Sequence, residues 1–405
     1  MIRRWKTAPW GAGVHAVYYT DAVLNVKGYV GVTDIYNYIQ YTQITDNLTV
    51  RDMEVLDDMA YLCGHTSTGN AFIGWIDLNT VGSSTAVFTI DTQVGSSVFM
   101  NSIENIVAYY DAYGNLCVAG YGITPSGYYG VEYDVSAAKD CIGALQYIPH
   151  DVAVTNNYVV YTGTVFGNDI VIHPIPKTGT FTHVYMPYYL YQVGSTTVSD
   201  PLGRLHITNT GGDGVATISY RLEGSEYGLI LREFDVSGAF TNYDVPMLSS
   251  TMVGLNYSAT VIFDFRYDSI SKRYAVFHNY EVNPSDYHDA VTKLDYSSGV
   301  LSSVQSDYLA ITNQTMTSMS LSDSSMYVVY GYSTISKENV FWKESLPPSM
   351  TGRCLYSDVL NVINPLPLIE GDRQDVHYGN TPGFPNTPLP INCMGSSDNI
   401  VPICH

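Results

Sequence analysis

The chain has 405 residues, of which 45% are apolar and only 14% are charged, and its formal net charge is −20. Lys and Arg are nowhere gathered as a phosphate backbone would require, and the acidity opposes adhesion to an anionic lipid surface, so neither nucleic acid nor membrane is expected as a partner. Apolar runs stay shorter than the ~18 residues that a spanning helix needs. We therefore expect no transmembrane segment.

A strand signature returns roughly every fifty residues along the chain. It consists of an apolar alternation, a polar turn, a Tyr-rich strand and a Gly, and it occurs at residues 53–64, 152–163 and 319–331. This period suits one antiparallel sheet of four strands, and closing such sheets into a ring removes their exposed edges. The sequence therefore predicts an all-β fold, a β-propeller. Two β-sandwiches are the second choice, but they would predict a composition break near the middle of the chain, and none is visible.

The repeat divides the chain into a propeller over 1–363 and a tail over 364–405. Seven four-stranded blades are predicted, and six or eight also fit the spacing. Their expected ranges are 14–48, 49–98, 99–148, 149–194, 195–252, 253–309 and 310–363. The first unit is short of an inner strand, which residues 359–363 have the apolar character to supply. Because prolines interrupt the tail, we expect it to be irregular and packed on the outside of the ring.

An Asp between apolar residues closes a strand in several units. The four examples are Asp77, Asp134, Asp235 and Asp295. Asp at such a position hydrogen-bonds the backbone N–H groups that follow it, so these residues are predicted to form turns and not to bind a ligand.

Tyrosine is the residue type in clear excess, with 36 copies. Most are expected to pack between sheets, because Tyr favours strands and buries well. The exception is the group Tyr185, Tyr188, Tyr189 and Tyr191, which lies at a connection between units. Two adjacent Tyr residues should not both face a core, so this group is predicted to be exposed and to bind a sugar ring or a protein partner.

Six cysteines are present without any Cys-x-x-Cys pair, which argues against zinc. Cys63 and Cys117 lie in apolar strands and are predicted to be buried thiols. Cys393 and Cys404 bracket a short polar loop and are the predicted disulfide. Together with the polar composition, this favours an extracellular or cell-surface location, although the basic residues 1–6 lack the apolar stretch of a secretory signal.

Catalytic signatures are missing from the sequence: it contains no nucleophile elbow, zinc-protease helix motif, phosphate loop or calcium loop. We predict no catalytic residue, no metal ligand and no cofactor. His65, His173, His206 and His278 end strands at comparable points of their units, so a ring of histidines is conceivable. Such residues are more often solvated or bonded to a carbonyl. Carboxylates could also meet at the propeller axis, but nothing in the sequence selects a pair.

The segment 50–64, followed by Phe72-Ile73-Gly74-Trp75-Ile76-Asp77, resembles blades of uncharacterised secreted or surface β-propeller proteins of the Bacteroidota. The resemblance covers about one unit well and the others loosely. It implies a propeller fold and export from the cell. It implies no activity, and no catalytic residue is carried over from it. The chain lacks the Gly-His and Trp-Asp markers of WD40 repeats and the Asp-box of sialidases.

Two functions follow from this. The first is a non-enzymatic binding or structural module, extracellular or at the cell surface, that presents propeller loops to a protein or glycan partner and could belong to a larger assembly. The alternative is a glycan-active hydrolase or lyase with its site on the axis, which needs acidic or His side chains close together in the central funnel.

Overall fold

The computed structural model describes residues 6–10, 14–20, 27–33, 39–44, 47–165, 169–177, 188–191, 205–223, 226–239, 242, 245–255, 259–269, 272–283, 286–297, 300–309, 314–321, 326–333, 339–345, 355–358, 374–377, 392–395 and 401–404. Apart from two short 3-10 turns, η1 (Leu78–Thr80) and η2 (Ser96–Val98), the regular elements in these ranges are strands. The prediction of an all-β chain is confirmed. No helix in the described ranges has the length and apolar character to cross a membrane.

The strands of the described residues form seven antiparallel sheets, each built mostly from consecutive strands. The first sheet contains β1 (Lys6–Pro9), β2 (His15–Thr20), β3 (Gly28–Thr33) and β4 (Ile39–Gln43). The second contains β5 (Leu48–Leu56), β6 (Met59–Thr66), β7 (Ala71–Asp77) and β8 (Val87–Asp91). The third contains β9 (Ser102–Tyr110), β10 (Leu116–Thr124), β11 (Gly127–Asp134) and β12 (Lys139–Leu145). The fourth contains β13 (Ile148–Val154), β14 (Tyr158–Val165), β15 (Asp169–Pro176) and β16 (Tyr188–Tyr191).

The remaining sheets follow the same plan. The fifth contains β17 (His206–Gly211), β18 (Gly214–Glu223), β19 (Glu226–Asp235) and β20 (Met247–Leu255). The sixth contains β21 (Ala259–Asp268), β22 (Arg273–Asn283), β23 (Asp286–Ser297) and β24 (Val300–Leu309). The seventh contains β25 (Gln314–Leu321), β26 (Met326–Ser333) and β27 (Asn339–Ser345). Four short strands complete the set: β28 (Leu355–Asp358), β29 (Gln374–His377), β30 (Asn392–Gly395) and β31 (Val401–Cys404).

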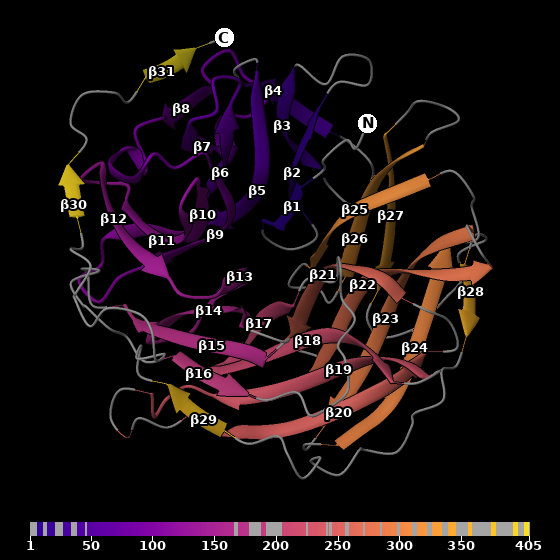
Figure 1. Cartoon of the computed structure of the whole chain (residues 1–405). Coiled ribbons are helices and arrows are strands. Elements are labelled where there is room, and N and C mark those ends of the chain that lie inside the picture. The colour runs from indigo at the N-terminus through magenta and orange to yellow at the C-terminus, as the bar shows by residue number, and fades with distance from the viewer. Residues whose placement is uncertain are drawn as a thin grey trace.

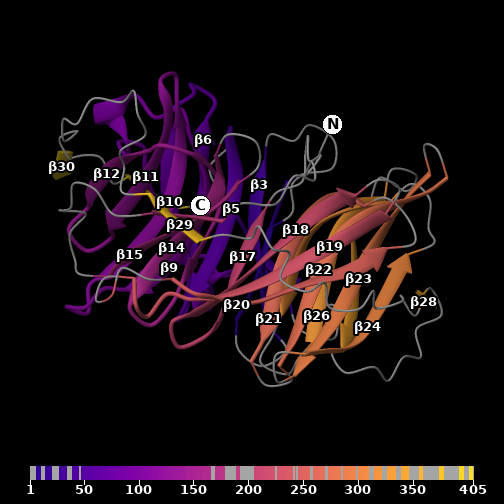
Figure 2. The same cartoon turned by 60° about the horizontal axis from the view of Figure 1, so that its bottom comes forward.

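The first strand of every sheet lies nearest the middle of the molecule, and these strands contact one another in a closed circuit. In order, the circuit is β1, β5, β9, β13, β17, β21 and β25, with β25 returning to β1. Figure 1 shows the sheets arranged around this centre, and the view turned by 60° shows their twist (Figure 2). The predicted β-propeller is confirmed.

The predicted completion of the first unit does not match the structure. Its inner strand is β1, at residues 6–9, ahead of the predicted start of the unit at residue 14. The chain was expected to reach back from residues 359–363, which lie outside the described residues. Within the described part, the ring closes where β25 of the seventh sheet packs on β1 of the first sheet. Neither sheet contributes a strand to the other.

The C-terminal strands run around the outside of the ring, as the yellow arrows in Figure 1 show. β28 pairs with β24, β29 with β16, β30 with β12 and β31 with β8, so the chain passes the sheets in reverse order. The tail over 364–405 was expected to be irregular, yet it supplies the short edge strands β29, β30 and β31. Pro402 lies within β31, because an outermost strand leaves the missing N–H facing away from the ladder. We call β29, β30 and β31 the C-terminal belt.

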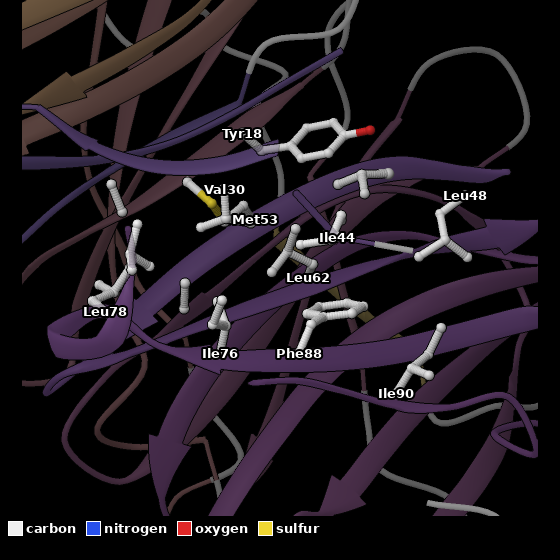
Figure 3. Packing of buried hydrophobic residues seen from close by; sticks show 14 of the residues in the cluster. Tyr18, Val30, Ile44, Leu48, Met53, Leu62, Ile76, Leu78, Phe88 and Ile90 are labelled. Carbon is white, nitrogen blue, oxygen red and sulfur yellow. The ribbon is translucent and has the colours of Figure 1, made fainter. Parts of the chain in front are cut away.

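The core lies between neighbouring sheets, so the inner parts of each sheet are covered on both faces. Between the first two sheets, Tyr18, Leu62 and Phe88 are fully buried in one cluster (Figure 3). Because both faces are covered, the strands read as long apolar runs and not as a clean alternation. Leu62 and Cys63, which are adjacent on β6, are both buried.

The Gly that ends the repeated signature has a packing reason. On the inner strand opposite Gly64, the pairing shifts by one residue between Val50 and Asp52, which is a β-bulge. A Cβ atom on Gly64 would lie 1.9 Å from the carbonyl oxygen of Thr49. Gly163 occupies the same place opposite the bulge in β13, where a Cβ would lie 2.2 Å from the carbonyl oxygen of Ile148. The second strand therefore approaches the bulge more closely than any side chain permits.

His173 on β15 is a buried histidine held among tyrosines. Its Nδ1 lies 2.9 Å from the hydroxyl of Tyr147, and the rings of Tyr161 and Tyr188 flank it. Its Nε2 has no hydrogen-bond partner among the described residues. Burial lowers the pKa of His173 to about 4. The native protein therefore holds this ring in the neutral form.

His173 should make the fold less stable in acid. The unfolded chain takes up a proton on this ring near pH 6.5, whereas the native ring takes one up only near pH 4. The contribution of His173 to the free energy of unfolding is therefore complete above pH 6.5 and is lost as the pH falls toward 4. We expect a loss of about 3 kcal/mol over this range. Urea unfolding of the wild type and of His173→Gln at pH 4.5 and pH 7.5 measures it, because the free energy of unfolding of the wild type relative to the variant should be lower at pH 4.5 than at pH 7.5. An unchanged pH dependence in that variant would contradict the prediction.

Candidate functional site

A polar pocket lies where the inner strands meet on the axis. Its described lining comes from β1, β5, β9, β13, β17 and β21. It includes five carboxylates, which are Asp52, Glu54, Glu104, Asp151 and Asp264. The cavity has a volume of about 70 Å³. This is room for about two water molecules and is well below the ~300 Å³ at which small-molecule pockets usually begin.

The β-bulges place side chains at this pocket. In β5, β9, β13, β21 and β25 the pairing with the second strand shifts at a corresponding point. The residues that follow these shifts are Asp52, Asn105, Asp151, Asp264 and Ser318, in that order. A bulge bends the strand and re-aims its side chains. One irregularity, repeated around the ring, therefore brings acids from distant parts of the chain to the axis.

Two of these acids join one inner strand to the next. Asp52 accepts a hydrogen bond from the backbone N–H of Ile106 on β9, at 3.1 Å. Asp151 accepts one from the backbone N–H of Ile207 on β17, also at 3.1 Å. Inner strands of neighbouring sheets do not share a ladder, so these carboxylates satisfy backbone donors that face the axis. Part of the acidic lining therefore has a structural role.

Four of the five acids are also paired with a basic side chain. The pairs are Lys6–Asp52 at 3.3 Å, Arg51–Glu104 at 3.3 Å, His206–Asp151 at 3.2 Å and Arg266–Asp264 at 3.1 Å. Pairing is what allows buried charges to persist at low dielectric. The Asp264 carboxylate raises the pKa of Arg266, which keeps the guanidinium charged.

Asp151 and His206 form the most enclosed pair. Both residues are buried, and the second ring nitrogen of His206 lies 3.0 Å from the carbonyl oxygen of Ile262. Burial raises the pKa of Asp151, but the hydrogen bond and the charge of His206, together with two backbone N–H groups, outweigh it and leave the pKa below its usual value. His206 faces an acceptor from each nitrogen, so it bridges β13, β17 and β21.

Glu54 is the acid for which the described residues show no ion pair. Burial is the main cause that raises the pKa of its carboxyl, to about 7; Arg266 opposes this, while Asp52 and Asp264 add to it. Near neutral pH this side chain is therefore divided between its neutral and charged forms. A carboxyl with such a pKa is suited to giving or taking a proton.

Glu54 should make the fold less stable as the pH rises. The native carboxyl holds its proton up to about pH 7, whereas the unfolded one releases it near pH 4.5, so stability falls between these values. The expected loss is about 2–3 kcal/mol. Glu54→Gln should abolish it, giving a variant more stable than the wild type at pH 8 and similar at pH 4.5. Thermal unfolding of the wild type and of Glu54→Gln across this pH range tests the prediction. If the stability of the two proteins depends on pH in the same way, the prediction is wrong.

Three of the four tyrosines predicted as a binding surface lie in the core. Tyr188, Tyr189 and Tyr191 are buried on β16, and Tyr185 lies outside the described residues. The hydroxyl of Tyr189 donates to the carbonyl oxygen of Ala239 at 2.9 Å, and the ring of Tyr191 packs on Phe234. Adjacent tyrosines are both buried because sheets cover both faces of β16, contrary to the reasoning from alternation. These side chains are not accessible to a ligand.

The other sequence-based candidates have mixed outcomes. Asp77, Asp134 and Asp235 accept hydrogen bonds from following backbone N–H groups, so their predicted role in turns is confirmed. Cys63 and Cys117 are buried free thiols, as predicted. Cys393 and Cys404 lie on β30 and β31, which pair with different sheets.

The four histidines do not form a ring. His65 lies beside Ser102, His173 lies among tyrosines and His278 contacts Thr292, while only His206 lines the pocket. Among the described residues, no group of three or more potential ligands is placed to hold a metal ion.

An exposed aromatic residue lies at the end of the ring where the inner strands begin. Phe99, after η2, is 81% exposed and has a left-handed backbone with φ of 54°. This conformation is strained for a bulky side chain. Ile148, the first residue of β13, is 50% exposed, and Ile123 is partly exposed on β10. The backbone N–H of Asn101 donates to the carbonyl of Ile123, so the Phe99 segment lies against β10.

We call Phe99, Ile123 and Ile148 the apolar rim. The pocket is lined by residues near the starts of β13 and β17 and by residues at or beyond the middle of β5 and β21, so it lies part-way along the inner strands. Sequence reasoning missed both features. One signal for the pocket was present, because Asp52 and Asp151 each precede the Gly of their signature by the same distance.

No protein-family model and no curated protein sequence matches the chain.

Proposed function

We propose that this protein is a non-enzymatic binding module, a rigid seven-bladed ring with one blade per sheet, that presents the apolar rim and the pocket mouth to a glycan or protein partner. Phe99 carries the proposal. A bulky side chain held in a strained backbone and exposed to solvent contributes little to stability, and strain of this kind gathers at functional sites. An exposed aromatic ring can stack on a sugar or anchor a protein.

The pocket supports binding more than catalysis. Its volume is too small for a sugar ring, and four of its five acids are occupied by ion pairs. A glycosidase needs two available carboxyl groups on either side of the scissile bond. Here only Glu54 stands apart from the ion pairs of the described residues. The pocket would receive a small polar group of the partner, such as a hydroxyl or an ammonium.

The proposed location is extracellular or the cell surface. Cys141 is disulfide-bonded, and disulfides persist in oxidising compartments. The low content of charged residues fits a surface that recognises partners. Kinship with secreted propellers of the Bacteroidota remains a prediction that no comparison tests.

The experiment uses a substitution that removes the aromatic ring without straining the fold. Asn tolerates a left-handed backbone better than Phe, so Phe99→Asn should keep or slightly raise thermal stability. On a glycan array and in pull-downs from the native source, the wild type should retain a partner and Phe99→Asn should lose it at least tenfold. The matched control is Tyr113→Asn, because Tyr113 is 78% exposed but lies in the turn at the far end of β9. Equal retention by both variants, or a wild type that retains no glycan and no protein, would refute the proposal.

The alternative is a glycan-active hydrolase or lyase that uses Glu54 as its acid. The pKa of about 7 is the observation that favours it. Release of reducing ends from a polysaccharide panel by the wild type, abolished in Glu54→Gln, would establish the enzyme and remove the non-enzymatic proposal.

A further inference from the structure

The cysteines of the chain are in different chemical states. Cys63 and Cys117 are free and buried, whereas Cys141 on β12 is disulfide-bonded. Within this chain, its partner must therefore be one of the three cysteines near the C-terminus. These are Cys354, Cys393 and Cys404.

The strand register selects among them. β30 of the C-terminal belt pairs antiparallel with β12, and Cys393 is the residue directly opposite Cys141. Directly opposite residues of antiparallel strands have Cα atoms about 4.5–5.5 Å apart, and a disulfide needs its Cα atoms within about 4.4–6.8 Å of each other. Cys404 lies opposite Val87 on the second sheet, and Cys354 directly precedes β28, which pairs with the sixth sheet. Neither of these strands pairs with β12.

We propose that a disulfide between Cys141 and Cys393 clasps the C-terminal belt onto the outer edge of the third sheet. Two thiols lose two protons and two electrons when the bond forms. A small-molecule disulfide of the glutathione type accepts them and leaves as two thiols. Exchange proceeds through a mixed disulfide with one cysteine, which the other cysteine then displaces.

The clasp gives the belt a covalent hold that its short strands lack. Each belt strand has four residues and pairs along one edge only. Segments with so few ladder hydrogen bonds open easily. The disulfide joins the belt at its middle strand, so the flanking strands β29 and β31 remain close to the sheets that they extend. It also leaves Cys404 without Cys393 as a partner, in contrast to the pairing predicted from the sequence.

Peptide mapping of the full-length protein tests the proposal. Free thiols are alkylated under denaturing conditions, and the chain is cut before Asp without reduction. Cys141 then lies in peptide 140–150, Cys393 in 375–397 and Cys404 in 398–405. We expect a cross-link between 140–150 and 375–397 that disappears on reduction. A cross-link from 140–150 to any other peptide, a link between 375–397 and 398–405, or an alkylated Cys141 would overturn the proposal.

Two variants identify the cysteine that is bonded to Cys141. Cys393→Ser should convert Cys141 into a thiol that is alkylated without reduction, whereas Cys404→Ser should leave the cross-link unchanged. The same variants report on the belt through hydrogen exchange of peptide 375–397, which should become at least tenfold faster in Cys393→Ser or after reduction of the wild type. Unchanged exchange in both cases would mean that the bond does not hold the belt.

Discussion

Replacing Gly64 by Ala is expected to lower the free energy of unfolding by roughly 3 kcal/mol or more. The added Cβ would lie 1.9 Å from the carbonyl oxygen and 2.9 Å from the carbonyl carbon of Thr49. Both atoms belong to the backbone of β5, so no side chain can rotate away. Either the bulge shifts or the hairpin between β5 and β6 separates. Chemical denaturation of the wild type and the variant measures the loss.

The same substitution should reach the axial pocket, because the bulge that Gly64 permits also places Asp52. We expect the pH dependence of stability that Glu54 causes to weaken in the variant, since Asp52 is one of the charges acting on Glu54. Gly69→Ala is the matched control. Gly69 lies in the turn between β6 and β7 and has a left-handed backbone, but a Cβ added there would meet no heavy atom within 4 Å. It should cost only about 1 kcal/mol, and equal costs for the two variants would contradict the packing explanation.

Replacing Asp151 by Ala is expected to cost about 3–5 kcal/mol, as is usual when one partner of a buried ion pair is removed. The change leaves a nitrogen of His206 and the backbone N–H of Ile207 without their acceptor. Both groups are buried between β13 and β17. Asp235→Ala is a suitable control, because that carboxylate accepts a hydrogen bond from Ser237 in an exposed turn and its loss should cost about 1 kcal/mol.

The pH dependence adds a second test of Asp151. Its pKa is lowered in the native state, so its stabilisation is present above its ordinary value of 3.8 and is lost as the pH falls through the lower native value. The difference between the wild type and Asp151→Asn should therefore persist at pH 5 and shrink below pH 4. A double-mutant cycle with His206→Ala should show a smaller cost for the pair than the sum of the single changes. Additive costs would show that the pair is not coupled.

The two candidate functions are partner binding at the apolar rim and glycan cleavage at the axial pocket. Binding requires the ring of Phe99 and no chemical step, whereas hydrolysis requires Glu54 as a proton donor. Testing Phe99→Asn and Glu54→Gln side by side on the same glycans therefore separates the two functions. A binding module should lose retention in Phe99→Asn and release no reducing ends in any form, whereas a hydrolase should release reducing ends that Glu54→Gln abolishes.

Sequence periodicity by itself determined the fold class of this protein, because each sheet is built mostly from consecutive strands joined by local turns. The turn role of Asp77, Asp134 and Asp235 could be predicted for the same reason, since their partners lie two or three residues away. The strand β1 escaped prediction because it is only four residues long and has no repeat signature.

Only the tertiary structure decided which acids meet at the axis and which tyrosines are hidden. Asp52, Asp151 and Asp264 are far apart in sequence, and ring closure brings the bulges that carry them to one pocket. Tyr188 and Tyr189 are both buried because sheets cover both faces of their strand, a condition that no local pattern reveals. Local hydrogen bonding is encoded in short segments of sequence, whereas burial and charge pairing depend on distant segments that packing brings together.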